Sequence, residues 1–222
     1  MRVLKGLIFD LDGTLIDSAP DLRHALNKTL VEQGRREVTL DEVKTLVGDG
    51  MLTTLQRAFE KTGAALSGDQ SYGLFQKFIT YYRQQTPDPA QIYPHVLDIM
   101  GQYKKEGVKL ALCTNKQEAA TLQLLDQLKL TRYFSFIAGG DTFLVHKPNP
   151  GHVTGVVTEL GLQPSDCVMV GDSINDVRAA KGAGLPCLVV TQGYGVDFDS
   201  LGADGLIADF QELPQALKRL GF

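Results

Sequence analysis

The 222-residue chain has few cysteines, no long apolar run and no strong charge of either sign. The three cysteines are an odd number and each lies in an apolar run, which argues against a disulfide framework and indicates free thiols in a reducing compartment. No apolar stretch approaches the roughly 20 residues that span a bilayer. The net charge of −4 supplies no general attraction for nucleic acid or an anionic membrane.

The N-terminal apolar run ends at Asp10 without a small-residue cleavage site. We therefore expect no signal peptide and a cytoplasmic location. The chain also lacks internal repeats and low-complexity tracts, and its 43% hydrophobic residues are typical of an ordinary globular protein.

Apolar, β-branched runs alternate with longer stretches of helical periodicity. Residues 110–113 and 168–170 are almost continuously hydrophobic, as expected of parallel strands buried on both faces. The order predicts an α/β fold with a doubly wound, Rossmann-like parallel sheet. We expect strands at 3–10, 108–114, 136–138, 167–171, 186–191 and 205–208. We expect helices between or after them at 94–106, 117–128, 151–160, 175–182 and 213–220.

Residues 18–89 interrupt this alternation, because helical patterns follow one another there without a convincing strand. Thr39-Leu-Asp-Glu42 is a capping-box pattern, and helices are also expected at 17–27, 51–62 and 72–85. Residues 87–94 are rich in proline and predict a hinge. The sequence therefore predicts an all-helical domain at 18–89, inserted into an α/β core formed by 1–17 and 90–222.

The first candidate for chemistry is a pair of carboxylates, Asp10 and Asp12, at the end of the first predicted strand. Gly13 and Thr14 follow at once, and Gly13 would permit a tight turn that brings the backbone close to a ligand. In open α/β sheets, ligands bind beyond the carboxyl ends of the strands. Taken alone, the pattern also fits an ordinary acidic turn.

A second acidic group follows another buried strand, where Asp172 comes after Gly171 and Asp176 lies four residues on. Asp176 could simply stabilise the start of a helix. Asp172, however, would meet Asp10 and Asp12 at the same sheet edge. Several carboxylates converging there predict a hard cation with oxygen ligands, and Mg²⁺ fits best because it commonly partners phosphate.

Thr114 and Asn115 would join the same edge from the strand at 108–113. The helix expected from residue 117 would direct its N-terminal amides there, which favours an anion. Lys147 lies between His146 and Pro148, just before a helix, and a lysine held there could neutralise a phosphoryl group. Singly, Thr114 reads as a strand-end residue and Lys147 as a surface lysine; the order and spacing of all four elements favour a site.

These four elements resemble those of the haloacid dehalogenase superfamily of Mg²⁺-dependent phosphohydrolases. The sequence is also similar to phosphoglycolate phosphatases along essentially the whole chain. The stretches that carry the resemblance are 9–20, 47–50, 114–116, 133–135, 139–141, 147–148 and 171–177. The resemblance implies a phosphatase that converts a small phosphate monoester, in particular 2-phosphoglycolate, to an alcohol and phosphate.

The resemblance also implies roles for the candidate residues. Asp10 would be the nucleophile that forms an aspartyl-phosphate, and Asp12 the general acid and then base. Thr114 and Lys147 would hold the phosphoryl oxygens, and Ser173 and Asp176 would support the site. Mg²⁺ would be bound by the Asp10 side chain, the Asp12 carbonyl and Asp172. The helical insertion would act as a cap that selects the substrate.

Substrate contacts are expected from Gly13, Thr14 and Asn115 in the core and from Gly48, Asp49, Gly50 and Arg57 in the insertion. Arg57 would pair with a substrate carboxylate, or else be a solvated helix arginine. Asp49 departs from the asparagine expected in phosphoglycolate phosphatases, which weakens the case for that substrate. Tyr194 is expected in a loop beside the site without an assigned role. The four histidines are expected at the surface or in loops (His24, His95, His146 and His152).

Several alternatives stay open. The substrate could be another small metabolite: a sugar phosphate, muramic acid 6-phosphate or pyrophosphate. A phosphosugar mutase is disfavoured because Leu22 stands where those relatives usually carry a cap histidine. Asp12 argues against dehalogenation, since haloacid dehalogenases lack the acid/base aspartate. A non-catalytic regulator that binds Mg²⁺ and phosphoesters is a further possibility, although such a protein would have no use for Asp12.

Overall fold

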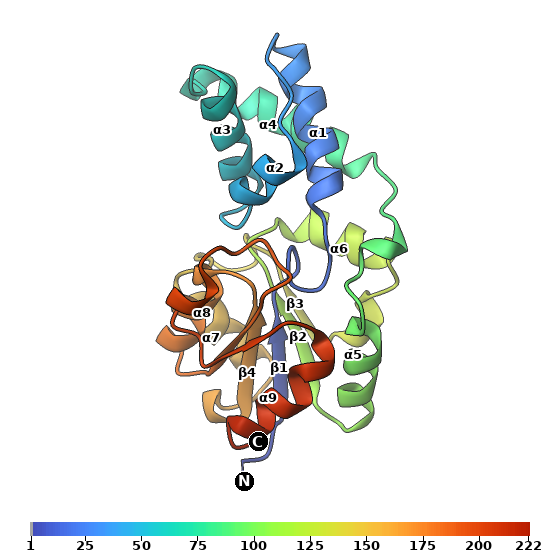
Figure 1. The fold of residues 1–222 in the computed structure, drawn as a ribbon, viewed down its shortest axis with the longest axis vertical. Helices are drawn as coiled ribbons and strands as arrows, with labels where there is room; N and C mark the ends of the chain where they lie inside the picture. The colour runs from blue at the N-terminus through green and yellow to red at the C-terminus, as the bar shows by residue number, and fades with distance from the viewer. Residues whose placement is uncertain (1) are drawn as a thin grey trace.

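The computed structural model describes residues 2–222, apart from the side chains of residues 69, 70 and 90. Within this part of the chain, six parallel strands form one sheet in the order β3-β2-β1-β4-β5-β6 (Figure 1). This is the doubly wound order that the alternating sequence predicts. The strands are β1 (Gly6–Phe9), β2 (Lys109–Cys113), β3 (Phe136–Ala138), β4 (Cys167–Gly171), β5 (Cys187–Val190) and β6 (Gly205–Ile207).

The first strand is the centre of the sheet because it pairs with β2 on one side and β4 on the other. Phe9 is the last residue of β1, and it aligns with Leu112 of β2 and Val170 of β4. The chain therefore leaves three adjacent strands at nearly the same level. Side chains that directly follow these strands must meet at one edge.

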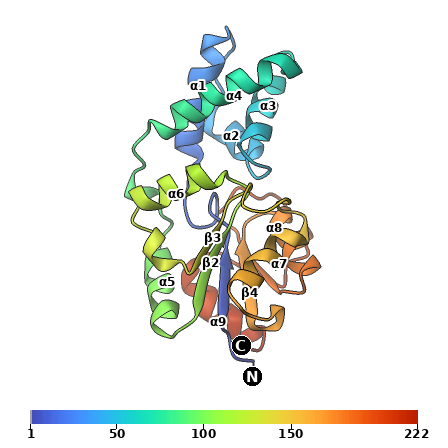
Figure 2. The ribbon, with the colours of Figure 1, turned by 180° about the vertical axis from the view of Figure 1, so that it is seen from behind.

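Helices cover both faces of the sheet, as Figures 1 and 2 show from opposite sides. On one face, side chains of α5 (Val96–Lys105), α6 (Glu118–Gln127) and α9 (Leu213–Arg219) share a buried cluster with the strands. On the other face, α7 (Pro150–Glu159) and α8 (Ile174–Gly182) do the same. The continuous hydrophobicity of the strands thus reflects burial on both sides. Short 3-10 helices occur at Pro89–Gln91, Thr131–Tyr133, Pro164–Asp166, Phe198–Ser200 and Phe210–Glu212.

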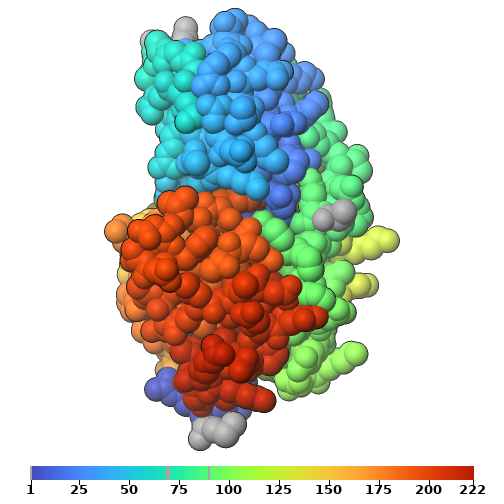
Figure 3. Space-filling model, viewed as in Figure 1, coloured from blue at the N-terminus to red at the C-terminus, as the bar shows by residue number. Residues whose placement is uncertain are grey.

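Among the described residues, five α-helices lie between β1 and β2, of which α5 packs on the sheet. The first four are α1 (Ala19–Glu32), α2 (Leu40–Leu46), α3 (Met51–Thr62) and α4 (Gly68–Arg83). We call residues 19–83 the helical segment. Its buried apolar residues form a cluster of their own, which Ala120 and the partly buried Tyr194 join from the rest of the chain. The segment lies beyond one end of the sheet (Figure 1), and Figure 3 shows most of its atoms gathered at one end of the molecule. The predicted capping box is present at α2, where Thr39 and Glu42 bond each other's backbone amides.

Three expected boundaries were wrong. The first strand begins at Gly6, three residues later than expected, and Val3 is 68% exposed. Helix α1 continues to Glu32 because Thr29 and Leu30 still bury against the helical segment's core. Helix α4 begins at Gly68, ahead of the expected residue 72.

The three cysteines are buried and free, in agreement with the predicted thiols (Cys113, Cys167 and Cys187).

Candidate active site

The predicted strand-end residues come together at the carboxyl edge of the sheet. Asp10 follows β1, Thr114 follows β2 and Asp172 follows β4. The sheet's hydrogen bonds continue into two of these positions: Asp10 N donates to Val170 O at 3.0 Å, and Thr114 N donates to Ala138 O at 3.0 Å. Asp10 and Thr114 are therefore positioned by backbone that the sheet itself holds. Thr114 is only 2% exposed and lines the pocket described below.

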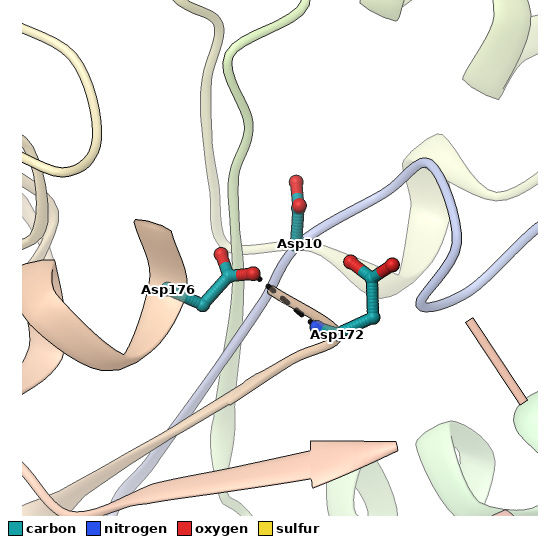
Figure 4. Close-up of side chains that lie close together, drawn as sticks. All are labelled: Asp10, Asp172 and Asp176. Carbon is teal, nitrogen blue, oxygen red and sulfur yellow. Dashed lines mark hydrogen bonds between the residues drawn. The ribbon is translucent and has the colours of Figure 1, made fainter. Parts of the chain in front are cut away.

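Asp10, Asp172 and Asp176 form a buried acidic group, in which one carboxylate oxygen from each residue lies within 4.8 Å of the others (Figure 4). Asp176 is fixed by three donors to Oδ2: the amides of Asp172 (3.2 Å) and Ser173 (3.0 Å) and the Ser173 hydroxyl (2.7 Å). Gly171 allows this approach, because a Cβ there would lie 2.3 Å from Cγ of Asp176. The predicted supporting pair, Ser173 and Asp176, is thus in hydrogen-bonding contact.

Lys147 joins this group from the loop before α7. Its Nζ lies 3.0 Å from Asp10 Oδ1 and 2.6 Å from Asp176 Oδ1, and its side chain is 1% exposed. Burial disfavours the charged ammonium, but attraction to Asp10 and Asp176 outweighs it, so the pKa of Lys147 is raised above its usual value. Lys147 is therefore a buried cation and not a surface lysine.

One ammonium does not offset three crowded carboxylates. Burial raises the pKa of Asp10 to about 6, with Asp176 adding to the rise and Lys147 opposing it. Burial, followed by the charges of Asp176 and Asp10, also raises the pKa of Asp172 well above its usual range. Keeping Asp10 and Asp172 ionised therefore costs free energy, and a further cation bound beside them would offset that cost.

Asp12 points to different partners from Asp10. Both of its carboxylate oxygens lie 2.9 Å from Nζ of Lys116, and the Ser18 hydroxyl donates to Oδ1. Lys116 was not among the predicted site residues, although it directly follows the predicted Thr114 and Asn115. Burial opposes its charge, but Asp12 stabilises the ammonium and the pKa of Lys116 is raised.

The loop after β1 and the loop after β5 close one side of the site. Gly13 has a φ of +82°, and a Cβ there would lie 2.3 Å from Oδ2 of Asp172. Thr14 Oγ1 donates to Asp172 Oδ1 at 3.4 Å. Tyr194 has a structural role that sequence did not predict: its amide donates to Asp172 Oδ2 at 2.7 Å, and its hydroxyl donates to Asp17 Oδ1 at 2.7 Å.

A pocket with an empty volume of about 370 Å³ lies between the sheet edge and the helical segment. The core lines it with polar groups: Asp10, Asp12, Thr114, Asn115 and Lys116. The helical segment lines it mostly with apolar side chains and backbone: Leu22, Val47, Gly48, Gly50, Met51 and Thr54. The site is thus polar at its floor and largely apolar at its roof.

The loop between α2 and α3 is tied to the core by two asparagines. Asn115 Nδ2 donates to the carbonyls of Gly48 (3.0 Å) and Lys147 (2.8 Å). Asn175, which sequence reasoning missed, donates to Oδ1 of Asp49 at 2.6 Å. The guanidinium of Arg57 pairs with Asp49. Asp49 and Arg57 are therefore engaged with each other, and neither is among the residues that line the pocket.

The expectation that His152 is a surface or loop residue was wrong. It lies in α7 and is fully buried. Its Nδ1 faces the amide of Lys147 at 3.3 Å and its Nε2 faces the carbonyl of Gly139 at 3.1 Å. A neutral ring protonated at Nε2 satisfies both contacts. His152 thus supports the backbone that carries Lys147.

Comparisons with known proteins show the family to which the chain belongs. The family described as haloacid dehalogenase-like hydrolase matches residues 7–190. The chain belongs to this family. It is 41% identical to a phosphoglycolate phosphatase of Agrobacterium fabrum, over 95% of this chain and 91% of the relative. It is 38% identical to a phosphoglycolate phosphatase of Caulobacter vibrioides, over 95% of this chain and 89% of the relative.

Two solved structures have the same fold. A crystal structure described as a predicted phosphoglycolate phosphatase from Haemophilus somnus superposes with a TM-score of 0.90 at 28% identity, covering 98% of this chain and 99% of that one. CbbY from Rhodobacter sphaeroides, in complex with phosphate, gives a TM-score of 0.80 at 25% identity, covering 97% and 100%. Together the comparisons confirm the predicted family and enzyme class, a phosphoric monoester hydrolase. Among the described residues, no helix is long and apolar enough to cross a membrane.

Proposed function

We propose that the protein is a Mg²⁺-dependent phosphatase that hydrolyses 2-phosphoglycolate to glycolate and phosphate through an aspartyl-phosphate on Asp10. The observation that carries this proposal is the separation of two neighbouring aspartates. Asp10 faces Lys147 and the acidic group, whereas Asp12 faces Lys116. Two carboxylates with different surroundings can take the two different roles that the reaction needs.

The donor set fits a magnesium ion. Asp10, Asp12, Asp172 and Asp176 carry four negative charges, and the two buried lysines among them carry two positive ones. The remaining charge of −2 equals the charge of one divalent cation, and the ligand atoms are oxygens, as Mg²⁺ prefers. We propose that the Asp10 side chain, the Asp12 carbonyl and Asp172 hold the ion. Bound there, Mg²⁺ would offset the negative charge of the phosphoryl oxygens.

Asp10 would act as the nucleophile. One of its oxygens attacks phosphorus, the bond from phosphorus to the ester oxygen breaks, and Asp12 gives its proton to that oxygen. Thr114 and Lys147 hold the phosphoryl oxygens, so that the attacking and leaving oxygens stay in line. In the second half, Asp12 takes a proton from water, the water oxygen attacks phosphorus, and phosphate leaves with Asp10 restored.

The helical segment would serve as the cap predicted for residues 18–89, with residues 1–17 and 90–222 as the catalytic core. Its largely apolar contribution to the pocket supports this role, because displacing bulk water protects an aspartyl-phosphate and strengthens the electrostatics of the site. The bonds from Asn115 and Asn175 to the loop at residues 48–49 would hold the cap closed.

The substrate assignment rests on the relatives named phosphoglycolate phosphatases and on the small pocket. We propose that the loop of Gly48, Asp49 and Gly50 contacts the glycolate end, with Gly13, Thr14 and Asn115 near the phosphate. The role predicted for Arg57, a pair with the substrate carboxylate, would require its ion pair with Asp49 to open.

The proposal is tested by comparing kcat/KM with Mg²⁺ across a panel of phosphate compounds. The panel holds 2-phosphoglycolate, glucose 6-phosphate, muramic acid 6-phosphate, pyrophosphate and p-nitrophenyl phosphate. We expect 2-phosphoglycolate to be preferred by at least tenfold, and Asp10→Asn to abolish turnover of every compound. A preference for another member of the panel would overturn the assignment of 2-phosphoglycolate as substrate. Wild-type protein that turns over none of the compounds would overturn the proposal that the protein is a phosphatase.

A further inference from the structure

A second buried lysine, Lys116, forms an ion pair with Asp12, as Lys147 does with Asp10. Its Nζ contacts both oxygens of Asp12 at 2.9 Å, and its side chain is 1% exposed. The ring of Tyr82, from α4 of the helical segment, lies 4.6 Å from the ammonium nitrogen. The ammonium therefore has one carboxylate partner on the core side and an aromatic face on the cap side.

The backbone of Lys116 is fixed from several directions. Its amide donates to Thr114 Oγ1 at 3.3 Å, and its carbonyl accepts from Gly140 N at 2.7 Å. A Cβ on Gly140 would lie 2.5 Å from the carbonyl oxygen of Asn115, so the two loops are in close contact. The same short loop that positions Thr114 therefore also positions the Lys116 ammonium.

Burying the pair of Lys116 and Asp12 costs free energy, and a role in the reaction would account for it. A buried ion pair often contributes less to stability than apolar residues of similar size, because both charges lose their hydration. Lys116 also lines the pocket, beside Asp10, Asp12 and Thr114. Its contact with both oxygens of Asp12 restricts the rotation of that carboxylate and keeps it apart from the acidic group around Asp10.

We propose that Lys116 is a positioning residue for the acid/base carboxylate of Asp12. This inference rests on the proposed phosphatase function and adds to it a residue to which the sequence analysis gave no role. Lys116 holds the Asp12 carboxylate toward the leaving oxygen in the first half of the reaction and toward the attacking water in the second. Without it, Asp12 would rotate, and proton transfer would slow in both halves.

The test uses Lys116→Met, which keeps the length of the side chain and removes the charge. Two substrates separate the steps: glycolate must be protonated as it leaves from 2-phosphoglycolate, whereas p-nitrophenolate leaves from p-nitrophenyl phosphate without a proton. For 2-phosphoglycolate we expect kcat to fall 10²–10³-fold with KM changed less than threefold, in line with the usual contribution of acid/base catalysis. For p-nitrophenyl phosphate we expect a burst of about one p-nitrophenolate per enzyme, followed by slow turnover, since only the second half still needs Asp12.

Two further variants complete the design. Lys116→Arg keeps the positive charge and should retain at least tenfold more kcat than Lys116→Met, and Lys116→Gln replaces the Met variant if circular dichroism shows that the latter is unfolded. Lys5→Met, which removes a 53% exposed lysine side chain that pairs with Asp166, is the matched control and should behave as wild type. Retention of kcat within threefold in the neutral variants, or an equal loss on both substrates without a burst, would overturn the inference. Wild-type protein that turns over neither substrate would instead overturn the proposed function.

Discussion

Single side chains at the sheet edge show how one chain can hold four carboxylates in a small volume. Lys147 bridges Asp10 and Asp176, and Lys116 holds Asp12, so no carboxylate of the first strand's end is left without a cation. The types and spacing of Asp10, Asp12, Thr114, Lys147 and Asp172 predicted that the strand ends would meet. The pairing of Lys116 with Asp12 could not be predicted, since the partners are 104 positions apart and lysines at such positions are usually solvated.

Replacing Asp10 by asparagine should separate activity from stability. Turnover should fall at least 10³-fold, because the amide oxygen of asparagine is a poor nucleophile for phosphorus. In buffer with a chelator, however, Asp10→Asn should raise the free energy of unfolding by roughly 1–3 kcal/mol, since burial disfavours the charged carboxylate and raises its pKa to about 6. Urea unfolding at pH 7.5 measures this difference. Asp166→Asn, at the surface pair with Lys5, is the control and should change stability by less than 1 kcal/mol. A metal-free Asp10→Asn protein less stable than wild type would contradict the prediction.

His152 should make stability depend on pH. Burial and then the charge of Lys147 lower its pKa from 6.5 to about 4 in the folded protein. Between about pH 6.5 and pH 4 the unfolded chain therefore binds more protons than the folded one, so the free energy of unfolding falls as the pH is lowered through this window. The glutamine of His152→Gln cannot titrate. When the pH is lowered from 7.5 to 4.5, the free energy of unfolding of this variant should therefore fall by about 1–3 kcal/mol less than that of wild type. Urea midpoints at the two pH values test this; parallel losses in both proteins would show that His152 does not titrate in this way.

At the scale of elements, the sequence predicted the strands and most helices because their hydrophobic periodicity is long and unbroken. The ends were less predictable, since they depend on where neighbouring elements stop. Val3 is apolar but lies outside the sheet, and α1 runs past residue 27 because Leu30 reaches the core of the helical segment. The register that brings β1, β2 and β4 to one level followed from the parallel order, and the predicted site depended on that register.

The loop after β5 should tolerate substitution as poorly as the loops that carry Asp10 and Asp172. A Cβ on Gly193 would lie 2.3 Å from Cβ of Asp172 and 2.5 Å from the carbonyl oxygen of Gly13. Because the second contact is with backbone, Gly193→Ala must displace either the loop or Asp172, and we expect kcat/KM to fall at least tenfold. Gly101→Ala, in the interior of α5 with nothing within 4 Å of a new Cβ, is the control. Gly101→Ala should leave activity unchanged and raise the free energy of unfolding, measured in urea, by roughly 0.5–1 kcal/mol. Wild-type kcat/KM in Gly193→Ala would show that the loop can adapt.

For the whole molecule, charge is distributed unevenly in a way that the net value of −4 does not reveal. The four carboxylates of the candidate site are concentrated where the sheet, the loop after β5 and the helical segment meet. The two buried lysines leave that region with an excess of two negative charges. Folding without a cation therefore forces like charges together in a region of low dielectric. Stability and metal binding should accordingly be linked.

Adding Mg²⁺ should stabilise the folded protein. At a concentration 100 times its dissociation constant, an ion that binds only the folded state adds about 2.7 kcal/mol to the free energy of unfolding. We expect a gain of this size in thermal or urea unfolding of wild-type protein, rising with the logarithm of the Mg²⁺ concentration. Asp172→Asn should remove most of the gain, because Asp172 is a proposed ligand buried beside Asp10, whereas Asp166→Asn should keep it. Equal stabilisation of wild type and Asp172→Asn would place the ion elsewhere. No stabilisation of wild type would mean that the excess charge at the sheet edge is balanced by protons on Asp10 and Asp172, whose pKa values burial raises.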